Sequence, residues 1–183
     1  MKYVAIHIKT LGLDPKIHQI IELNAIADDL NEQLPIEKLP KFQTYVSYET
    51  YSGCAYALAE HAGIFNKISN YNNNGVNICY PETLIGNFNN FLYNKCGYKY
   101  GETVNIAGKN FANFDNKFLE KLENYSFIKI HHRIIDPAIL YFIPTDTVLP
   151  SLEQCVERAG IEIKSTAEMV VQLLRHKFPK NCE

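Results

Sequence analysis

The stretch that decides the fold is YVAIHIKTLGLDPKIHQIIELNAI, which spans Tyr3–Ile26. It opens with an apolar, β-branched run over Tyr3–Ile8 that stops at a glycine-containing segment, and this pattern predicts a buried first strand. A second strand is expected within Ile17–Ala27, and the alternation over Phe42–Tyr48 predicts a third. Three strands in succession, with a proline-containing linker before the third, predict an antiparallel meander.

The remainder of the chain predicts helices and two further strands. The elements expected from periodicity and turn residues are a helix over Ala55–Ile68, an exposed loop over Tyr71–Asn77, a helix starting near Pro81, a strand over Val104–Ala107, a helix with Phe111, Phe114, Phe118 and Leu122 on one face, a strand over Phe127–Ile135, and helices over Ser151–Ala159 and Ser165–Phe178. This order predicts one α/β domain over residues 1–183, with a ribonuclease-H-like mixed five-stranded sheet flanked by helices.

The composition is that of a globular protein, with 46% hydrophobic residues, 21% charged residues and a formal net charge of −2. A strongly basic protein would attract nucleic acid through its overall field, and this chain does not have such a field. Any basic surface therefore has to be a local patch.

The cysteines and the first residues bear on the cellular compartment. The five cysteines show no C-x-x-C spacing, and their odd number favours reduced thiols over a disulfide framework or a zinc ribbon. Lys9 and Asp14 interrupt the apolar start before it could act as a signal peptide, and no stretch approaches the roughly 20 apolar residues that span a bilayer. We expect a cytoplasmic protein with no membrane partner.

Several segments, in the same order, resemble the DEDDh family of 3′–5′ exonucleases, which includes RNase T, oligoribonuclease and proofreading subunits. The opening stretch is similar to the family's first motif, in which an apolar strand carries Asp-x-Glu-Thr and is followed by Gly-Leu-Asp-Pro and Ile-Ile-Glu. The segment AGKNFANFDNKFL, Ala107–Leu119, is similar to the second motif, with its Asn-x-x-x-Phe-Asp pattern. His131–Pro137, Leu149–Ile161 and Val170–Phe178 resemble the later framework. The resemblance covers nearly the whole chain and implies a single exonuclease-like domain.

In that family four carboxylates hold two divalent ions, and a histidine acts as general base on the attacking water. The resemblance places His7 at the first aspartate and Lys9 at the glutamate, and it keeps Asp115 as the second-motif aspartate. Aligning back from the last helix places Ile161 at the histidine and Thr166 at the last aspartate. Asp115 is thus the one catalytic carboxylate that the chain retains in this alignment.

This exchange changes the charge at the site. Asp115 and Lys9 cancel and His7 is near neutral, so two Mg²⁺ ions would find little compensation for their lost hydration. We expect no metal there, with the Lys9 ammonium replacing a cation and pairing with Asp115. A shifted register in the third motif would bring Glu168 inward in place of Thr166.

Two interpretations are open for several of these residues. His7 is either a ligand for Zn²⁺ or Mn²⁺ or a hydrogen-bonded histidine that fills the vacated site. Asp115 is either a remnant catalytic base or a residue that steadies a helix start. Glu22 follows the family's framework glutamate and has either a structural or a catalytic role.

The resemblance also implies candidates for nucleic-acid binding: Thr10, Leu11, Asn110 and Phe111, although Phe111 at helical spacing is also typical of a core residue. The pair His131–His132 suggests a metal site, but in a strand adjacent side chains would point to opposite faces. Aromatic and basic residues also interleave over residues 93–100, as in single-strand binders or at a solvated helix end.

Three functions follow from this pattern. The first is a catalytically degenerate exonuclease-fold protein that binds single-stranded RNA or DNA, or a protein partner, without metal-dependent cleavage. The second is an active 3′–5′ exonuclease with an altered centre, which alone would use Mg²⁺ or Mn²⁺. The third is a protein-interaction or inhibitor module that makes contact through the region of residues 66–94, which holds ten asparagines. The oligomeric state is not predicted.

Overall fold

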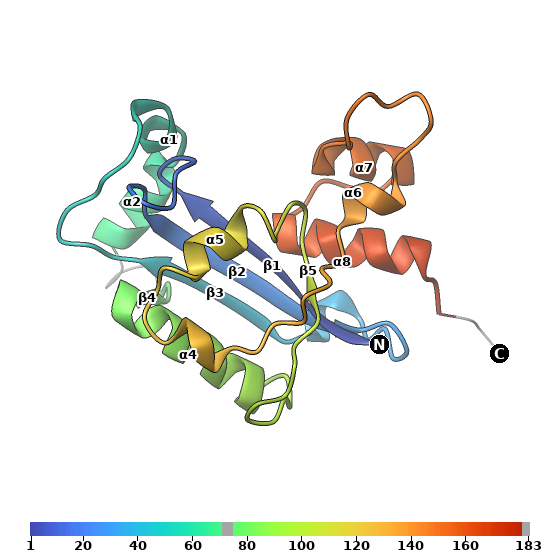
Figure 1. Cartoon of the computed structure of the whole chain (residues 1–183), viewed down its shortest axis with the longest axis horizontal. Helices are drawn as coiled ribbons and strands as arrows, with labels where there is room; N and C mark the ends of the chain where they lie inside the picture. The colour runs from blue at the N-terminus through green and yellow to red at the C-terminus, as the bar shows by residue number, and fades with distance from the viewer. Residues whose placement is uncertain (71–74, 181–183) are drawn as a thin grey trace.

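A computed structural model describes residues 1–70 and 75–180 and places a five-stranded sheet at the centre of the chain (Figure 1). The strand order is β4-β3-β2-β1-β5. Strands β1, β2 and β3 pair antiparallel, whereas β5 runs parallel to β1 and β4 parallel to β3. The predicted meander and the mixed sheet are therefore confirmed. The strands are β1 Lys2–Thr10, β2 Ile20–Asp29, β3 Lys41–Val46, β4 Ile78–Cys79 and β5 Ile106–Ala107.

Helices flank the sheet on both sides. They are α1 Ala55–Glu60, α2 Ala62–Ser69, α4 Pro81–Asn94, α5 Asp115–Leu119, α6 Pro137–Leu140, α7 Leu152–Ala159 and α8 Thr166–Lys177, with 3-10 turns η1 Ile36–Lys38 and η2 Tyr125–Phe127. The predicted helix over Ala55–Ile68 is present, but it is interrupted at His61. Within the described ranges, no helix combines the length and hydropathy that crossing a bilayer requires.

The fifth strand is not the one that the sequence predicted. Phe127–Ile135 forms two isolated bridges, Val104 with Ile130 and Ala107 with Ile135. Val104 and Ala107 are three positions apart, whereas their partners Ile130 and Ile135 are five apart, so the residues between Ile130 and Ile135 bend away from the sheet. Within this bend the backbone N–H of Arg133 donates to His131 Nδ1 at 3.1 Å. The remaining strand of the five is β4, which the sequence did not predict because two residues are too few to show periodicity. The loop predicted over Tyr71–Asn77 lies partly outside the described residues.

The predicted helix around Phe111–Leu122 is also shorter than expected. Asn110 adopts a left-handed φ of 54°, and its carbonyl accepts the N–H groups of Asn113 and Phe114, which makes a turn before α5. Gly108 brings this turn against β1, since a Cβ there would lie 2.9 Å from the carbonyl oxygen of Ile6. Helix α5 therefore begins only at Asp115.

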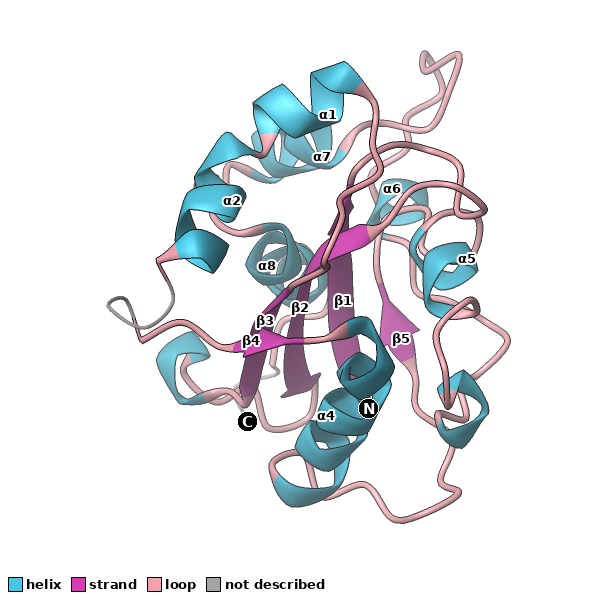
Figure 2. Cartoon of the chain, turned by 90° about the vertical axis from the view of Figure 1, so that its left-hand side faces the viewer, coloured by secondary structure: helices cyan, strands magenta, loops and turns pink. Residues whose placement is uncertain are grey.

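The two faces of the sheet bury different side chains of β1. Val4, Ile6 and Ile8 belong to the core that includes α4, whereas Tyr3 and Ala5 belong to the core that includes α7 and α8. Figure 2 shows α4 and α8 on opposite sides of the sheet. Since side chains alternate along a strand, His7 and Lys9 lie on the α8 face.

A buried ion pair fixes α8 against β2. Arg175 donates from Nη2 and Nε to the two carboxylate oxygens of Asp28 at 2.6 and 2.9 Å, and the Tyr3 hydroxyl donates to the same carboxylate at 3.0 Å. The Asp28 carboxylate is thus fully partnered although its side chain is buried. This contact anchors the last turn of α8 to the sheet.

Candidate functional site

Beyond the part that α8 covers, the same face of the sheet carries polar residues in two rows. The strand register aligns Lys9, Glu22 and Tyr45 in one row, and His7, Asn24 and Gln43 in the next. Except for the buried Tyr45, these residues form the floor of a groove, called the sheet groove below. Its walls come from α2, through Ile64 and Lys67, and from residues 164–168 at the start of α8.

A pocket continues from the sheet groove toward α5 and shares three lining residues with it: His7, Lys9 and Thr166. Asp115 enters this pocket from the first turn of α5. The structure thus brings together four of the residues that the resemblance singled out, from β1, α5 and α8. Glu168 lines the sheet groove only, where it lies 3.8 Å from Lys41 Nζ, so Thr166 rather than Glu168 lies beside Asp115.

The predicted pair between Lys9 and Asp115 is wrong. Lys9 Nζ lies 3.5 Å from Glu22 Oε2, and Glu22 also accepts a hydrogen bond from Gln43 Nε2 at 2.6 Å. The reason is the register, because Lys9 and Glu22 are direct cross-strand partners on one face. Asp115 is instead hydrogen-bonded to the backbone of β1, since its Oδ1 accepts the N–H of Ile8 at 2.9 Å.

His7 and Asp115 approach each other, with 3.7 Å between Nδ1 and Oδ1. Burial, helped by the Lys9 ammonium, lowers the pKa of His7 to about 4, so its imidazole is neutral at neutral pH. Burial raises the pKa of Asp115 to about 6, against the opposing effect of the Ile8 N–H. The carboxylate therefore has a neutral neighbour and no cation to offset its charge in this pair.

A further cation lies at the α2 wall. Lys67 Nζ donates to the Tyr45 hydroxyl at 2.8 Å, and Gln43 Nε2 contacts the same hydroxyl at 3.1 Å. A chain of hydrogen bonds therefore runs from Glu22 through Gln43 and Tyr45 to Lys67, and the ion pair with Lys9 extends it at the Glu22 end. Glu22, which is 3% exposed, is a structural centre of this chain.

Three of the predicted nucleic-acid contacts are wrong because they are buried. Leu11 is 0% exposed, and residues 53–54 lie directly on it, with the N–H of Cys54 donating to its carbonyl at 2.8 Å. Phe111 is 1% exposed and belongs to the α4 core, so it cannot stack on a base. Thr10 turns inward and donates to the Gly12 carbonyl at 2.7 Å. Asn110 is exposed and lines the pocket, so it remains a candidate.

The position predicted for the general base also lies elsewhere. Ile161 packs against the core of α7 and α8 and lines neither the pocket nor the sheet groove. Besides His7, a second imidazole lines the pocket: that of His61, at the junction of α1 and α2. Sequence reasoning missed it because the helical pattern runs through this position without a break signal.

The donors present do not fit a pair of Mg²⁺ ions. At the four aligned positions stand an imidazole, an ammonium, one carboxylate and a hydroxyl, whereas Mg²⁺ requires anionic oxygen ligands. Over residues 1–70 and 75–180, no group of three His, Cys, Asp or Glu side chains is placed to hold a metal ion.

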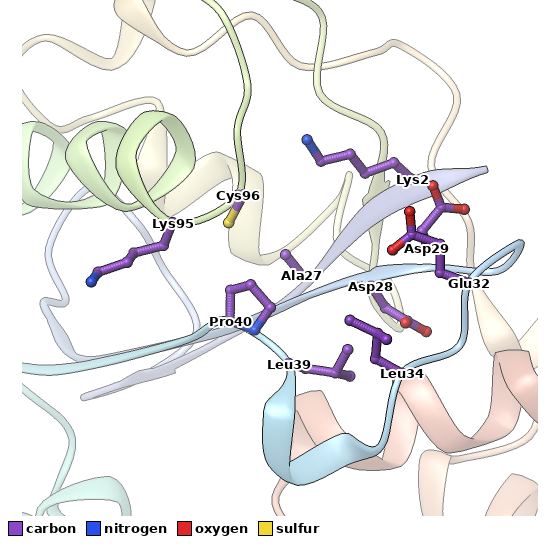
Figure 3. Close-up of a pocket in the computed structure, with 10 residues that line it drawn as sticks. All are labelled: Lys2, Ala27, Asp28, Asp29, Glu32, Leu34, Leu39, Pro40, Lys95 and Cys96. Atoms are coloured by element: carbon purple, nitrogen blue, oxygen red, sulfur yellow. The ribbon is translucent and has the colours of Figure 1, made fainter.

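A separate pocket lies near the opposite end of β1 and β2 (Figure 3). Asp28, Asp29 and Glu32 gather on one side of it and Lys95 on the other. Asp28 is neutralised by Arg175, and Asp29 pairs with the N-terminal ammonium at 2.8 Å. This pocket holds none of the residues that the resemblance singled out.

The sheet order and the helices on both faces define an α/β fold of the ribonuclease-H-like type. Solved structures with this fold include an exonuclease I bound to its product (TM-score 0.62, 12% identity, covering 96% of this chain and 42% of that chain). They also include an SSB/exonuclease I complex with the inhibitor CFAM (TM-score 0.67, 13% identity, 98% and 42%). A third is E. coli exonuclease I with a 5cy-dT13 oligonucleotide (TM-score 0.61, 13% identity, 97% and 41%).

This chain spans about two fifths of the length of those proteins, since it covers 42% of the first two. No family model and no curated protein sequence matches it. The likeness establishes the fold.

Proposed function

We propose that this protein is a catalytically degenerate exonuclease-fold protein that holds single-stranded nucleic acid in the sheet groove and the adjoining pocket without metal-dependent cleavage. The observation that carries the proposal is Lys9. It stands where the resembled family has a metal-binding glutamate, and its ammonium lies 3.5 Å from Glu22. A cation held there by a buried carboxylate opposes a metal ion and favours a phosphate.

The charge of the lining supports the same function. The sheet groove and the pocket are lined by five carboxylates and five lysines, so the surface is neutral when the histidines are neutral. Two of the lysines, Lys67 and Lys109, have no carboxylate of residues 1–70 and 75–180 within salt-bridge distance. A phosphate backbone would meet cations here that a four-carboxylate site does not offer.

Binding is tested by fluorescence anisotropy with labelled single-stranded DNA and RNA of about 15 nucleotides, at about 50 and about 200 mM salt. We expect salt-sensitive binding that weakens on the order of tenfold in a Lys67→Ala, Lys109→Ala double variant, because two phosphate contacts are lost. The matched control is Lys16→Ala with Lys38→Ala, which removes the same charge away from the groove. An absence of salt-sensitive binding at micromolar protein would refute nucleic-acid binding.

The loss of cleavage is tested on end-labelled oligonucleotides with Mg²⁺ or Mn²⁺. We expect no shortening by the wild-type protein. Shortening that disappears in Asp115→Ala would show that the centre is active, and would refute degeneracy while leaving binding intact.

One observation favours an active hydrolase with an altered centre as the second candidate function. The pocket holds two imidazoles, His7 and His61, beside the carboxylate of Asp115. Such a set could supply a base and an acid without two metal ions. The same cleavage assay, repeated on His61→Ala, tests this candidate, which requires activity that is lost in both His61→Ala and Asp115→Ala.

A further inference from the structure

A hollow that belongs to neither the sheet groove nor its pocket lies at the β5 edge of the sheet. Two segments line it, Tyr100–Gly101 and residues 125–130. Both carry aromatic rings that face water, since Tyr100 is 83% exposed and Phe127 54% exposed. We call this hollow the edge pocket.

The aromatic rings of the edge pocket are held in place by neighbours. Tyr100 lies against Tyr93 with 6.5 Å between ring centroids, and the Tyr125 hydroxyl donates to Asn116 Oδ1 at 2.5 Å. Phe127 ends the short turn η2. Large rings that are positioned but remain uncovered leave their faces available to a planar ligand.

The one charged residue that lines the edge pocket is basic, Lys129. In the neighbouring sequence Lys99 and Arg133 are basic and Glu102 is acidic, and Glu120 accepts a hydrogen bond from the Asn116 amide that holds Tyr125. The segment after Phe127 is extended, with Ile128 buried, Ile130 half-buried and Lys129 exposed between them. A basic side chain therefore lines the same pocket as the exposed rings, and Arg133 follows it four residues later in the sequence.

His131 and His132 continue this edge. Their rings stack with 4.5 Å between centroids, which corrects the expectation that they point to opposite faces, because the segment bends and is not a strand. They add two further planar groups beside Arg133. Aromatic faces interleaved with cations are the arrangement that binds single strands without sequence preference.

We propose that the edge pocket is a second contact for single-stranded nucleic acid, in which a base stacks on Phe127 and Tyr100 while Lys129 and Arg133 meet the adjacent phosphates. An apolar peptide would fit the rings but would leave the basic rim unused. The proposal shares its ligand class with the proposed function, and it concerns a different surface.

Helix α5 connects the two surfaces. Asp115 faces β1 and the pocket, and the next residue, Asn116, holds Tyr125 of the edge pocket. A strand longer than a few nucleotides could contact both sides of α5. Shorter ligands would distinguish the two contacts.

The chain contains no tryptophan, so Phe127→Trp creates a single fluorescent reporter in the edge pocket. We expect oligothymidylate to quench this fluorescence and an abasic deoxyribose-phosphate oligomer of equal length to leave it unchanged. Phe142→Trp is the matched control, because Phe142 is 49% exposed and lines neither surface. In the anisotropy assay, Tyr100→Ala should weaken binding about fivefold or more.

The outcomes separate this inference from the proposed function. Quenching that persists when Lys67→Ala and Lys109→Ala are added supports an independent edge pocket. Oligonucleotide binding without quenching, or equal quenching of Phe142→Trp, overturns the edge pocket and leaves the sheet groove standing. Quenching by an apolar peptide but not by oligothymidylate assigns the pocket to a protein and overturns the inference. If no oligonucleotide binds either surface, both proposals fail.

Discussion

At the scale of single residues, His7 and Asp115 set the pH response of the site. Burial moves both pKa values toward the neutral form, down to about 4 for His7 and up to about 6 for Asp115. A raised aspartate pKa means that stability rises as the pH falls from about 6 toward 3.8, and a lowered histidine pKa means that stability falls as the pH falls from 6.5 toward 4. The two effects oppose each other in almost the same window, so together they change the wild-type stability little.

Replacing Asp115 with Asn should separate these effects. The amide oxygen can still accept the N–H of Ile8, and the buried charge is removed, so we expect a gain of up to about 3 kcal/mol at pH 7 and about half of that at pH 5. Below pH 6.5 the variant should lose stability, because His7 is then unopposed. Urea unfolding at several pH values measures this. A variant less stable than wild type at pH 7 would show that the carboxylate has a favourable cationic partner.

At the scale of elements, the segment before α1 covers the residue that follows β1, Leu11. A Cβ on Gly53 would lie 2.5 Å from the Leu11 Cβ and 2.8 Å from its carbonyl oxygen, so the two segments touch directly. This contact buries Leu11 and removes it from any ligand. The groove therefore starts at Lys9.

Gly53→Ala should consequently destabilise the protein by about 1–3 kcal/mol, because two backbone segments have to move apart. Gly86→Ala in α4 is the control. A Cβ there meets nothing within 4 Å, and alanine in a helix interior should add about 0.5–1 kcal/mol. Thermal unfolding of both variants measures the difference. If Gly53→Ala were as stable as the wild type, the two segments would be able to move apart without a loss of stability, and the close contact would not be required.

At the scale of the whole molecule, the fold gathers on one pocket the residues that the resemblance places at carboxylate positions. His7, Lys9, Asp115 and Thr166 converge there from three separate elements.

A variant with His7→Asp, Lys9→Glu and Thr166→Asp should regain metal binding beside Asp115. We expect Mn²⁺ to raise the melting temperature of this variant, by the equivalent of about 2.7 kcal/mol at a hundredfold excess over Kd, and to leave the wild type unchanged. Adding Asp115→Asn should remove most of the effect. A comparable Mn²⁺ response in the wild-type protein would contradict the assignment of a degenerate site.

Local sequence patterns were sufficient for much of the fold. Tyr3–Ile8 buries side chains on both faces of the sheet and is therefore a continuous apolar run, whereas the final two helices bury one face each, which leaves a helical period in the sequence. The same patterns failed at β4 and at Phe127–Ile135, since a strand of two residues has no period and a bridged, bent segment can alternate like a strand.

What the sequence determined by itself is the fold class, because the periodicity of strands and helices is a local property. Only the tertiary structure decided that Lys9 pairs with Glu22, that Leu11 and Phe111 are buried, and that His61 enters the pocket. Each of these depends on strand register or on a contact between segments distant in the chain, and no local pattern encodes such contacts.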